Sequence, residues 1–179
     1  NPSASSTPKV CVSLGLSRLL PNSKVVGLHF GNLPDVSGVT PSWNGTDFSK
    51  YKAHNWHCLD GRDRGDYGVI YTSFGCPFNC YYCNIHSLYK GITYRNLQDV
   101  EKELDFLVRR GVKNLKIADE LFTANRRHVY QTCDALAGKD LNVWAYARVG
   151  TVNPPLLKRM KNAGINWLCY GFESGNEDI

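Results

Sequence analysis

The chain from residue 68 onward alternates short apolar runs with longer stretches in which apolar residues recur at helical spacing. The short runs are rich in β-branched and aromatic residues, which predicts strands at residues 68–72, 114–118, 142–147 and 166–171. The longer stretches predict helices that begin near residues 97, 126 and 154. Strands that alternate with helices are typical of βαβ units, so we expect an α/β fold with a parallel sheet.

The ends of the three helices are marked by residues that favour helix boundaries. Each helix follows an asparagine that can act as its N-cap, namely Asn96, Asn125 and Asn153. Each ends before a glycine suited to the position after the helix, namely Gly111, Gly138 and Gly164. Four strands and three helices are too few for a closed barrel of eight βα units. The pattern therefore indicates an open sheet or a truncated barrel.

The first third of the chain is less regular. Its pattern predicts a short helix at residues 10–20 and a strand at residues 24–30. Residues 31–49 are dense in Gly, Pro, Asn, Asp and Ser, which is typical of a linker. Aromatic residues that punctuate its continuation, such as Trp43 and Trp56, favour a linker packed on a surface. Because the chain begins without Met and stops directly after a strand, we expect a piece of a longer protein.

Composition supports a globular protein and narrows the expected partners. The 179 residues are 42% hydrophobic and 21% charged, which excludes collagen-like, coiled-coil and largely disordered chains. No apolar run is long enough to span a membrane and no signal peptide is visible, so we expect a cytoplasmic protein without a membrane partner. The net charge of +5 is mild and evenly spread, which disfavours a nucleic-acid partner.

Three of the seven cysteines form the strongest chemical signal, the run Cys76-Pro-Phe-Asn-Cys80-Tyr-Tyr-Cys83. The run follows the first predicted strand, which places it at the C-terminal edge of the sheet, where parallel α/β folds carry their active sites. Thiolates are the usual ligands of iron–sulfur clusters, and three of them can bind three irons of a four-iron cluster. The fourth iron would lack a ligand from this motif, and an open metal position indicates a site that binds substrate.

The cysteines and their neighbours also allow other interpretations. A structural zinc site would need a fourth ligand, and it is disfavoured because paired Cys-x-x-Cys knuckles are absent. The candidates for that ligand are His54, His57, Cys58 and His86. Residues 54–58 could also line an active-site mouth, although a linker segment docked by Trp56 is the favoured interpretation. The cysteines in apolar patterns, which we expect to be buried small hydrophobes, are Cys11, Cys133 and Cys169.

The motif, its place after the first strand and the repeating βα units resemble the radical S-adenosylmethionine (radical SAM) superfamily over residues 67–179. The resemblance implies a partial (βα)6 barrel of about four βα units, truncated at its C-terminal end. It implies that Cys76, Cys80 and Cys83 bind a [4Fe-4S] cluster whose open iron is chelated by SAM. One electron from the reduced cluster would cleave SAM to a 5′-deoxyadenosyl radical. The resemblance also implies an electron donor, such as flavodoxin or ferredoxin, and a small-molecule substrate.

Residues at the ends of successive strands offer groups that match SAM. Glu120 could accept a hydrogen bond from the SAM ammonium, and the planar fork of Arg148 could hold the SAM carboxylate. The full set of expected SAM-binding residues is Tyr82, Asp119, Glu120, Arg148, Glu173 and Ser174. Where the family often has Gly-Gly-Glu, this chain has Ala118-Asp119-Glu120, a departure that leaves the role of Glu120 open. We expect no catalytic residue beyond the cluster ligands.

Residues 10–83 resemble the junction that precedes the barrel in the cobalamin-dependent subgroup of this superfamily. The resemblance implies that residues 1–66 are the tail and linker of a cobalamin-binding domain outside this chain, and that residues 67–179 are the first four strands of the radical SAM core. The implied reaction is methylation of an unactivated carbon with methylcobalamin as the methyl donor. The alternatives are a radical SAM methylthiotransferase acting on transfer RNA, a non-catalytic zinc-stabilised binding module, and a fragment that is inactive because two βα units are missing.

Overall fold

The computed structural model describes residues 37–38, 40–58, 63–172 and 175. The chain divides into two compact units, Asn1–Asp35 and Val36–Ile179, and all described residues belong to the second. The helix expected at residues 10–20 and the strand expected at residues 24–30 lie outside the described residues. Within the described part of the chain, no helix has both the length and the apolar character needed to cross a membrane.

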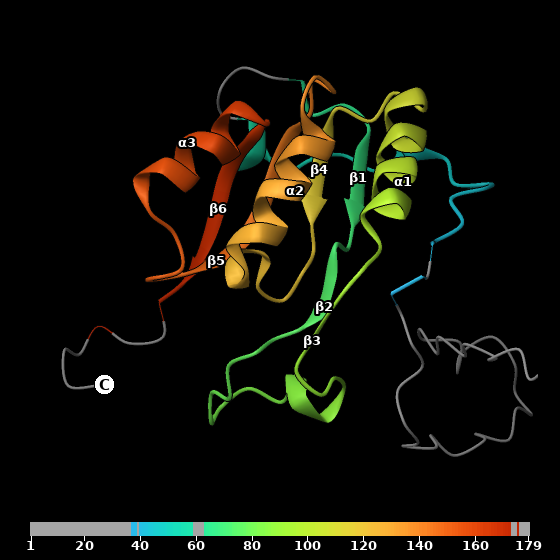
Figure 1. Cartoon of the computed structure of the whole chain (residues 1–179). Helices are drawn as coiled ribbons and strands as arrows, with labels where there is room; N and C mark the ends of the chain where they lie inside the picture. The colour runs from blue at the N-terminus through green and yellow to red at the C-terminus, as the bar shows by residue number, and fades with distance from the viewer. Residues whose placement is uncertain (1–36, 39, 59–62, 173–174, 176–179) are drawn as a thin grey trace, which may run out of the picture. The chain divides into compact units, whose positions relative to one another are not determined.

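A four-stranded parallel sheet forms the centre of this unit (Figure 1). Its strands, in spatial order, are β1 (Tyr67–Ile70), β4 (Asn114–Ile117), β5 (Asn142–Arg148) and β6 (Ile165–Gly171). Each successive parallel strand pairs with the one before it, which is the arrangement that repeated βαβ units produce. The four predicted strands and the α/β class are confirmed, and the arrangement is that of a partial barrel.

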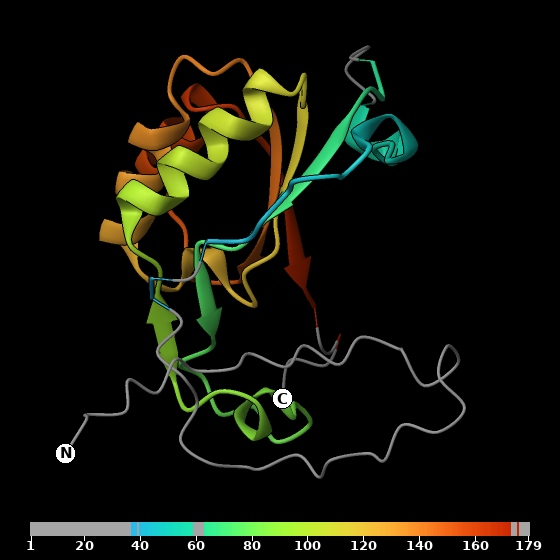
Figure 2. The same ribbon diagram turned by 90° about the vertical axis from the view of Figure 1, so that its right-hand side faces the viewer.

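Three helices cover one face of the sheet (Figures 1 and 2). They are α1 (Leu97–Arg109), α2 (Arg126–Leu136) and α3 (Pro154–Asn162). The side chains of three N-cap residues accept hydrogen bonds from backbone N–H groups of the first turn, as predicted for Asn96, Asn125 and Asn153. The predicted closing glycines have positive φ, the conformation that favours glycine after a helix: Gly111, Gly138 and Gly164.

The two faces of the sheet differ in character because alternate residues of a strand point to opposite sides. Toward the helices, residues such as Ile117 and Val143 are fully buried and pack in one apolar cluster with side chains of α1, α2 and α3. The opposite side, which we call the inner face, carries the intervening residues, among them Lys116, Trp144 and Tyr146. The Lys116 ammonium lies 4.6 Å from the centre of the Trp144 ring.

A second, two-stranded sheet was not predicted. β2 (Ser73–Gly75) and β3 (Ile92–Tyr94) pair antiparallel and carry the cysteine motif between them, together with the 3-10 helix η4 (Ile85–Ser87). This cysteine hairpin, residues 73–94, extends beyond the C-terminal ends of the parallel strands (Figure 2). Strands of three residues show no recognisable alternation, and they pair across a long loop, so the sequence pattern indicated only a loop here.

The later part of the linker, residues 48–58, packs beside the N-terminal ends of the strands. It contains the 3-10 helices η2 (Phe48–Lys50) and η3 (Asn55–Cys58). The Trp56 ring meets the rings of Trp144 and Trp167 edge-on, with centroid distances of 5.3 and 5.9 Å. The favoured interpretation of residues 54–58, a linker segment docked by Trp56, is confirmed.

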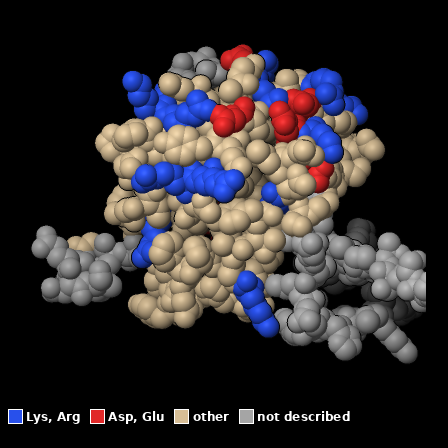
Figure 3. Space-filling view, viewed as in Figure 1, with Lys and Arg blue, Asp and Glu red and all other residues tan. Residues whose placement is uncertain are grey.

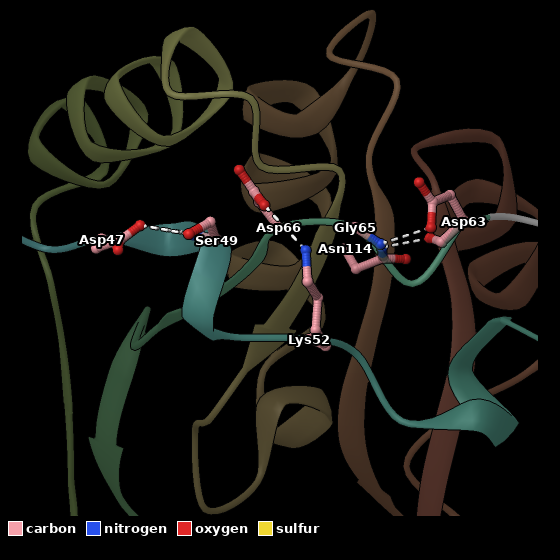
Figure 4. A network of polar contacts seen from close by, with 7 residues as sticks. All are labelled: Asp47, Ser49, Lys52, Asp63, Gly65, Asp66 and Asn114. Carbon is pink, nitrogen blue, oxygen red and sulfur yellow. Dashed lines mark hydrogen bonds and ion pairs between the residues drawn. The ribbon is translucent and has the colours of Figure 1, made fainter.

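Polar contacts fasten the linker to the starts of β1 and β4 (Figure 4). Lys52 and Asp66 form an isolated antiparallel bridge, and Lys52 Nζ lies 3.5 Å from Asp66 Oδ1. At the start of β4, Asn114 Nδ2 donates a hydrogen bond of 2.8 Å to the Asp63 carbonyl. These contacts join the linker and the segment before β1 to the sheet as one packed unit.

Candidate functional site

The three motif cysteines lie in one short loop after β2. Cys76 follows β2 directly, and the Cys83 N–H donates to the Cys80 carbonyl at 3.0 Å, which closes a tight turn. All three are free thiols; Cys76 and Cys80 are half-buried and Cys83 is exposed. Burial is the main cause that raises the pKa of the Cys76 thiol, and negative charge on Cys80, Cys83 and Glu120 raises it further. A cationic metal centre would reverse this balance, because a coordinating thiol is deprotonated.

The chemistry of this donor set fits an iron–sulfur cluster, since thiolates are the usual protein ligands of such clusters. Among the described residues, no three His, Cys, Asp or Glu side chains are arranged to hold one metal ion. Cysteines that bind different irons of one cluster have no need to converge on a single point. His86, one candidate for a fourth zinc ligand, has its Nε2 atom 2.6 Å from the Phe78 carbonyl oxygen.

Asp119, which closely follows β4, is fully buried. Its carboxylate accepts hydrogen bonds from the Thr72 N–H at 2.6 Å, the Thr72 hydroxyl at 2.5 Å and the Ser73 hydroxyl at 2.7 Å. Desolvation raises the pKa of Asp119 despite these hydrogen bonds, which act to lower it. Thr72 and Ser73 mark the point where the chain passes from β1 to the cysteine hairpin. We infer that Asp119 anchors the start of the hairpin through these hydrogen bonds. Its contact with SAM stays a prediction.

His128 completes this buried cluster from the first turn of α2. Its Nε2 atom lies 2.7 Å from Thr72 Oγ1. Because the Thr72 hydroxyl hydrogen points to Asp119, we assign the imidazole proton to Nε2, which then donates to Thr72. Burial lowers the pKa of His128 to about 4, so the ring is neutral at pH 7. Sequence reasoning missed this residue, although its place on the apolar stripe of α2 was a signal of burial.

Glu120 and Arg148 lie beside the cysteine loop. Glu120 Oε2 accepts a hydrogen bond of 2.8 Å from the Gly75 N–H, one residue before Cys76. Arg148 ends β5, and its guanidinium carbon lies 4.1 Å from the centre of the Phe78 ring, which belongs to the motif loop. The fold therefore brings a carboxylate and a guanidinium from two different strand ends to the cysteine motif.

Of the remaining predicted SAM-binding residues, the structure describes only Tyr82. Tyr82 is 54% exposed, and its ring meets the Tyr81 ring edge-on with centroids 5.2 Å apart. Its contact with adenine stays a prediction. Glu173 and Ser174 lie outside the described residues.

Two of the cysteines expected to be buried differ in exposure. Cys133 of α2 is buried, as predicted. Cys169 is exposed, so its expected burial is wrong. The register of β6 pairs it with Tyr146 on the inner face, away from the helices. Cys11 lies outside the described residues.

Comparisons with known proteins agree with the fold. A curated relative from Pyrococcus horikoshii, described as an uncharacterized methyltransferase, is 33% identical over 144 residues, which cover 78% of this chain and 29% of the relative. A protein of Methanocaldococcus jannaschii, provisionally named a methylthiotransferase, is 30% identical over 127 residues, which cover 65% of this chain and 28% of that protein. The chain thus spans less than a third of the length of these relatives.

A solved structure shares the architecture. It is the radical SAM methyltransferase TsrM from Kitasatospora setae with cobalamin and a [4Fe-4S] cluster bound, and it aligns with a TM-score of 0.57 at 20% identity. The alignment covers 64% of this chain and 24% of the TsrM chain. The family model of the radical SAM superfamily matches residues 70–179, which include the cysteine motif, the strands β4, β5 and β6 and all three helices. This chain belongs to the radical SAM superfamily.

Proposed function

We propose that the protein is a radical SAM enzyme and that Cys76, Cys80 and Cys83 hold its [4Fe-4S] cluster. When bound, the cluster supplies the electron that cleaves SAM reductively to a 5′-deoxyadenosyl radical. The observation that carries the proposal is the position of three free thiols in one loop at the C-terminal edge of a parallel sheet. The match of the superfamily model to residues 70–179 supports the same assignment.

Residues near the motif are assigned to the ends of the SAM molecule. Arg148 is suited to the SAM carboxylate, because a planar guanidinium can bind a carboxylate through two parallel hydrogen bonds. Glu120 uses Oε2 to hold Gly75, so we assign Oε1 to accept from the SAM ammonium. The exposed ring of Tyr82 offers an apolar surface for adenine. Glu173 and Ser174 are assigned to the ribose or methionine end of SAM.

The reaction we propose is methylation of an unactivated carbon of a small molecule, with cobalamin bound by a domain outside this chain. The name of the Pyrococcus relative and the cobalamin in the TsrM structure support this assignment. The electron donor would be a small redox protein such as flavodoxin or ferredoxin. Asp119, Thr72 and His128 contribute indirectly, because they fix the base of the hairpin that carries the thiols.

Methylthiolation of transfer RNA is the second candidate function. The name of the Methanocaldococcus relative supports the methylthiolation and names no substrate. Transfer RNA is a polyanion, which needs a concentrated basic surface. In the view of Figure 3, charged side chains of both signs gather over the helices, while the lower part, over the cysteine hairpin, is largely neutral. Transfer RNA that copurifies with the protein, and that keeps it from precipitating until a nuclease is added, would favour this candidate over small-molecule methylation.

Metal analysis after anaerobic reconstitution tests the cluster directly. We expect about four irons and four sulfides per chain in the native protein, as a [4Fe-4S] cluster requires. The single variants Cys76→Ala, Cys80→Ala and Cys83→Ala should lose this stoichiometry. Cys169→Ala is the matched control, because it removes another exposed thiol from a different strand. Zinc near one equivalent without sulfide in a folded sample would contradict the proposal and favour a zinc-stabilised binding module.

A further inference from the structure

We propose that Trp43 of the linker is a positioning residue for the cysteine hairpin and acts through the buried pair of Glu103 and Arg95. The inference rests on the proposed function, because the hairpin matters to catalysis only if its thiols hold the cluster. Its structural part, the coupling between linker and hairpin, is independent of what the hairpin binds.

The first step is the way the returning strand of the hairpin is held. Arg95 directly follows β3 and is 4% exposed. Its N–H donates to the Thr72 carbonyl at 3.0 Å, and its side-chain Nη1 donates to the Tyr71 carbonyl at 2.6 Å. Arg95 therefore binds the segment that leads into the hairpin with both its backbone and its side chain.

The second step is the buried ion pair that orients Arg95. Its Nη1 lies 2.7 Å from Glu103 Oε2 on α1, and the two side chains are 1% and 0% exposed. A carboxylate removed from water is destabilising unless its oxygens are hydrogen-bonded. The second oxygen, Glu103 Oε1, accepts a hydrogen bond of 2.7 Å from the Trp43 indole Nε1–H. Trp43 of the linker thus supplies the hydrogen bond to the second oxygen of Glu103, the carboxylate that orients Arg95.

Two further observations sharpen this dependence. Arg95 Nε and Nη2 are buried and have no hydrogen-bond partner among the described residues, so Glu103 is the carboxylate on which this guanidinium relies. The linker also touches the hairpin root at a second point, because the Asn96 N–H donates to the Ser37 carbonyl at 2.8 Å. The linker therefore forms two hydrogen bonds near the position where the hairpin rejoins the fold, one at Asn96 and one at Glu103.

The consequence is reciprocal coupling between linker and hairpin. If the Trp43 hydrogen bond is lost, Glu103 keeps a buried oxygen without its donor, and the position of Arg95 loses its support. Linkage requires that whatever orders the hairpin also favours the seated linker, and the reverse. The linker would thereby transmit a change at Trp43 to the loop that carries the three thiols.

The test compares two tryptophans of the same linker in the full protein. Trp43→Phe keeps a ring against Phe48, where the centroids are 5.8 Å apart, but removes the donor to Glu103. Trp56→Phe is the matched control, since it alters linker packing at Trp144 and Trp167 without touching Glu103. We expect backbone amide exchange of residues 73–94 to rise at least fivefold in Trp43→Phe and to stay within twofold in Trp56→Phe. Equal exchange in the two variants would overturn the proposal.

A second variant and a second readout separate positioning from general destabilisation. Glu103→Gln keeps an acceptor for Trp43 but removes the charge opposite Arg95, so exchange should rise in the hairpin. The Thr46 amide, which donates to the Trp43 carbonyl at 3.2 Å, should exchange as in the native protein. In the reconstituted protein, Trp43→Phe should weaken the SAM-dependent change in the electron paramagnetic resonance signal. A native protein that forms no cluster would count against the proposed function, whereas the exchange comparison in cluster-free protein decides the coupling.

Discussion

The two edges of the parallel sheet are built from different chemistry. At the N-terminal edge, a ladder of neutral amides links the first residues of neighbouring strands: Asn142 Nδ2 donates to Asn114 Oδ1 at 2.9 Å and to the His57 carbonyl at 2.8 Å, and Asn166 Nδ2 donates to Asn142 Oδ1 at 2.8 Å. The C-terminal edge instead gathers thiols, carboxylates and a guanidinium. The contrast shows how a parallel α/β fold separates the groups that hold it together from those that can do chemistry.

The two edges also differ in the contacts that hold them in place. The amide ladder satisfies buried donors and acceptors without any charge, and it fastens the linker through the His57 carbonyl. The C-terminal edge is secured by buried ionisable groups, namely Asp119 with His128 and Arg95 with Glu103. The cysteine loop is thus held by buried ionisable groups, so we expect its position to respond to changes that leave the opposite edge intact.

Replacing one glycine at each edge by alanine should give the largest effects. It should separate cluster loading, which depends on the C-terminal edge, from folding stability, which depends on the N-terminal edge. At Gly75, where φ is +83°, a Cβ would lie 2.1 Å from the Gly91 carbonyl oxygen and 2.9 Å from Tyr89 Cβ. At Gly164, where φ is +93°, it would lie 2.4 Å from the Leu141 carbonyl oxygen. We expect Gly75→Ala to disrupt the hairpin and abolish cluster loading, and Gly164→Ala to lower the free energy of unfolding by about 4 kcal/mol or more.

Iron content and urea unfolding measure these two effects. Gly91→Ala is the control, because φ is +77° there and no atom lies within 4 Å of the added Cβ. Gly91→Ala should lower the free energy of unfolding by about 1 to 2 kcal/mol, from backbone strain alone. Normal cluster loading in Gly75→Ala would contradict the proposal that the C-terminal edge positions the cluster ligands.

Removing the buried carboxylate should show that Asp119 anchors the hairpin. Asp119→Ala leaves the Thr72 N–H and two hydroxyls without their acceptor, so we expect the free energy of unfolding to fall by about 3 kcal/mol. Urea unfolding measures the loss. Glu101→Ala, an exposed change on α1, should alter stability by less than about 0.5 kcal/mol. A variant that keeps native stability but loses SAM affinity would favour the cofactor-binding role instead.

Acid should weaken the C-terminal edge selectively through His128. Its folded pKa of about 4 lies below the ordinary histidine value of 6.5, so the unfolded chain binds the proton more readily and stability falls as the pH drops between these values. The loss reaches up to about 3 kcal/mol, since one pKa unit corresponds to about 1.4 kcal/mol. Asp119 acts in the opposite sense, because its raised pKa makes its protonation favour the native state toward acid, and this reduces the net loss.

Urea unfolding of native protein and His128→Gln at pH 7 and at pH 4.5 tests this dependence. The variant should show a flatter response to acid, because its amide does not titrate. His54→Gln removes an exposed histidine of the linker and serves as the control. Identical acid dependence in native protein and His128→Gln would refute the assignment of the buried neutral imidazole.

The amide ladder should give the smallest effect, and one that does not depend on pH. Asn142→Ala removes two donated hydrogen bonds and one accepted bond at the N-terminal edge. We therefore expect the free energy of unfolding to fall by about 2 kcal/mol. The loss should be the same at pH 7 and pH 4.5, and cluster loading should persist. Asn162→Ala, an exposed change in α3, is the control and should have little effect. A change in cluster loading would show that the two edges are not independent.

The sequence predicted those parts of the fold that local rules determine. Asn96, Asn125 and Asn153 begin the helices because a short polar side chain can bond the free N–H groups of a first turn. Apolar periodicity likewise located all four parallel strands to within two residues. Both signals depend on neighbours in the chain, so neither requires knowledge of the tertiary structure.

Other features depend on contacts between distant residues and were missed. The pairing of Ser73–Gly75 with Ile92–Tyr94 brings together two short segments without periodicity. Asp119 and Glu120 look alike as acidic residues after a strand, yet only Asp119 is buried beneath the hairpin root. Cys169 was assigned to the core from its apolar neighbours, and strand register alone decides that it faces the other way.

The most direct test of the central claim is electron paramagnetic resonance of the anaerobically reconstituted and reduced protein, recorded with and without SAM. We expect the signal of a four-iron cluster that changes shape when SAM is added, because the iron without a cysteine ligand is open to SAM. A variant in which Cys76, Cys80 and Cys83 are all replaced by alanine should give no such signal. A folded protein with a cluster signal that SAM leaves unchanged, or with zinc in place of iron and sulfide, would contradict the account.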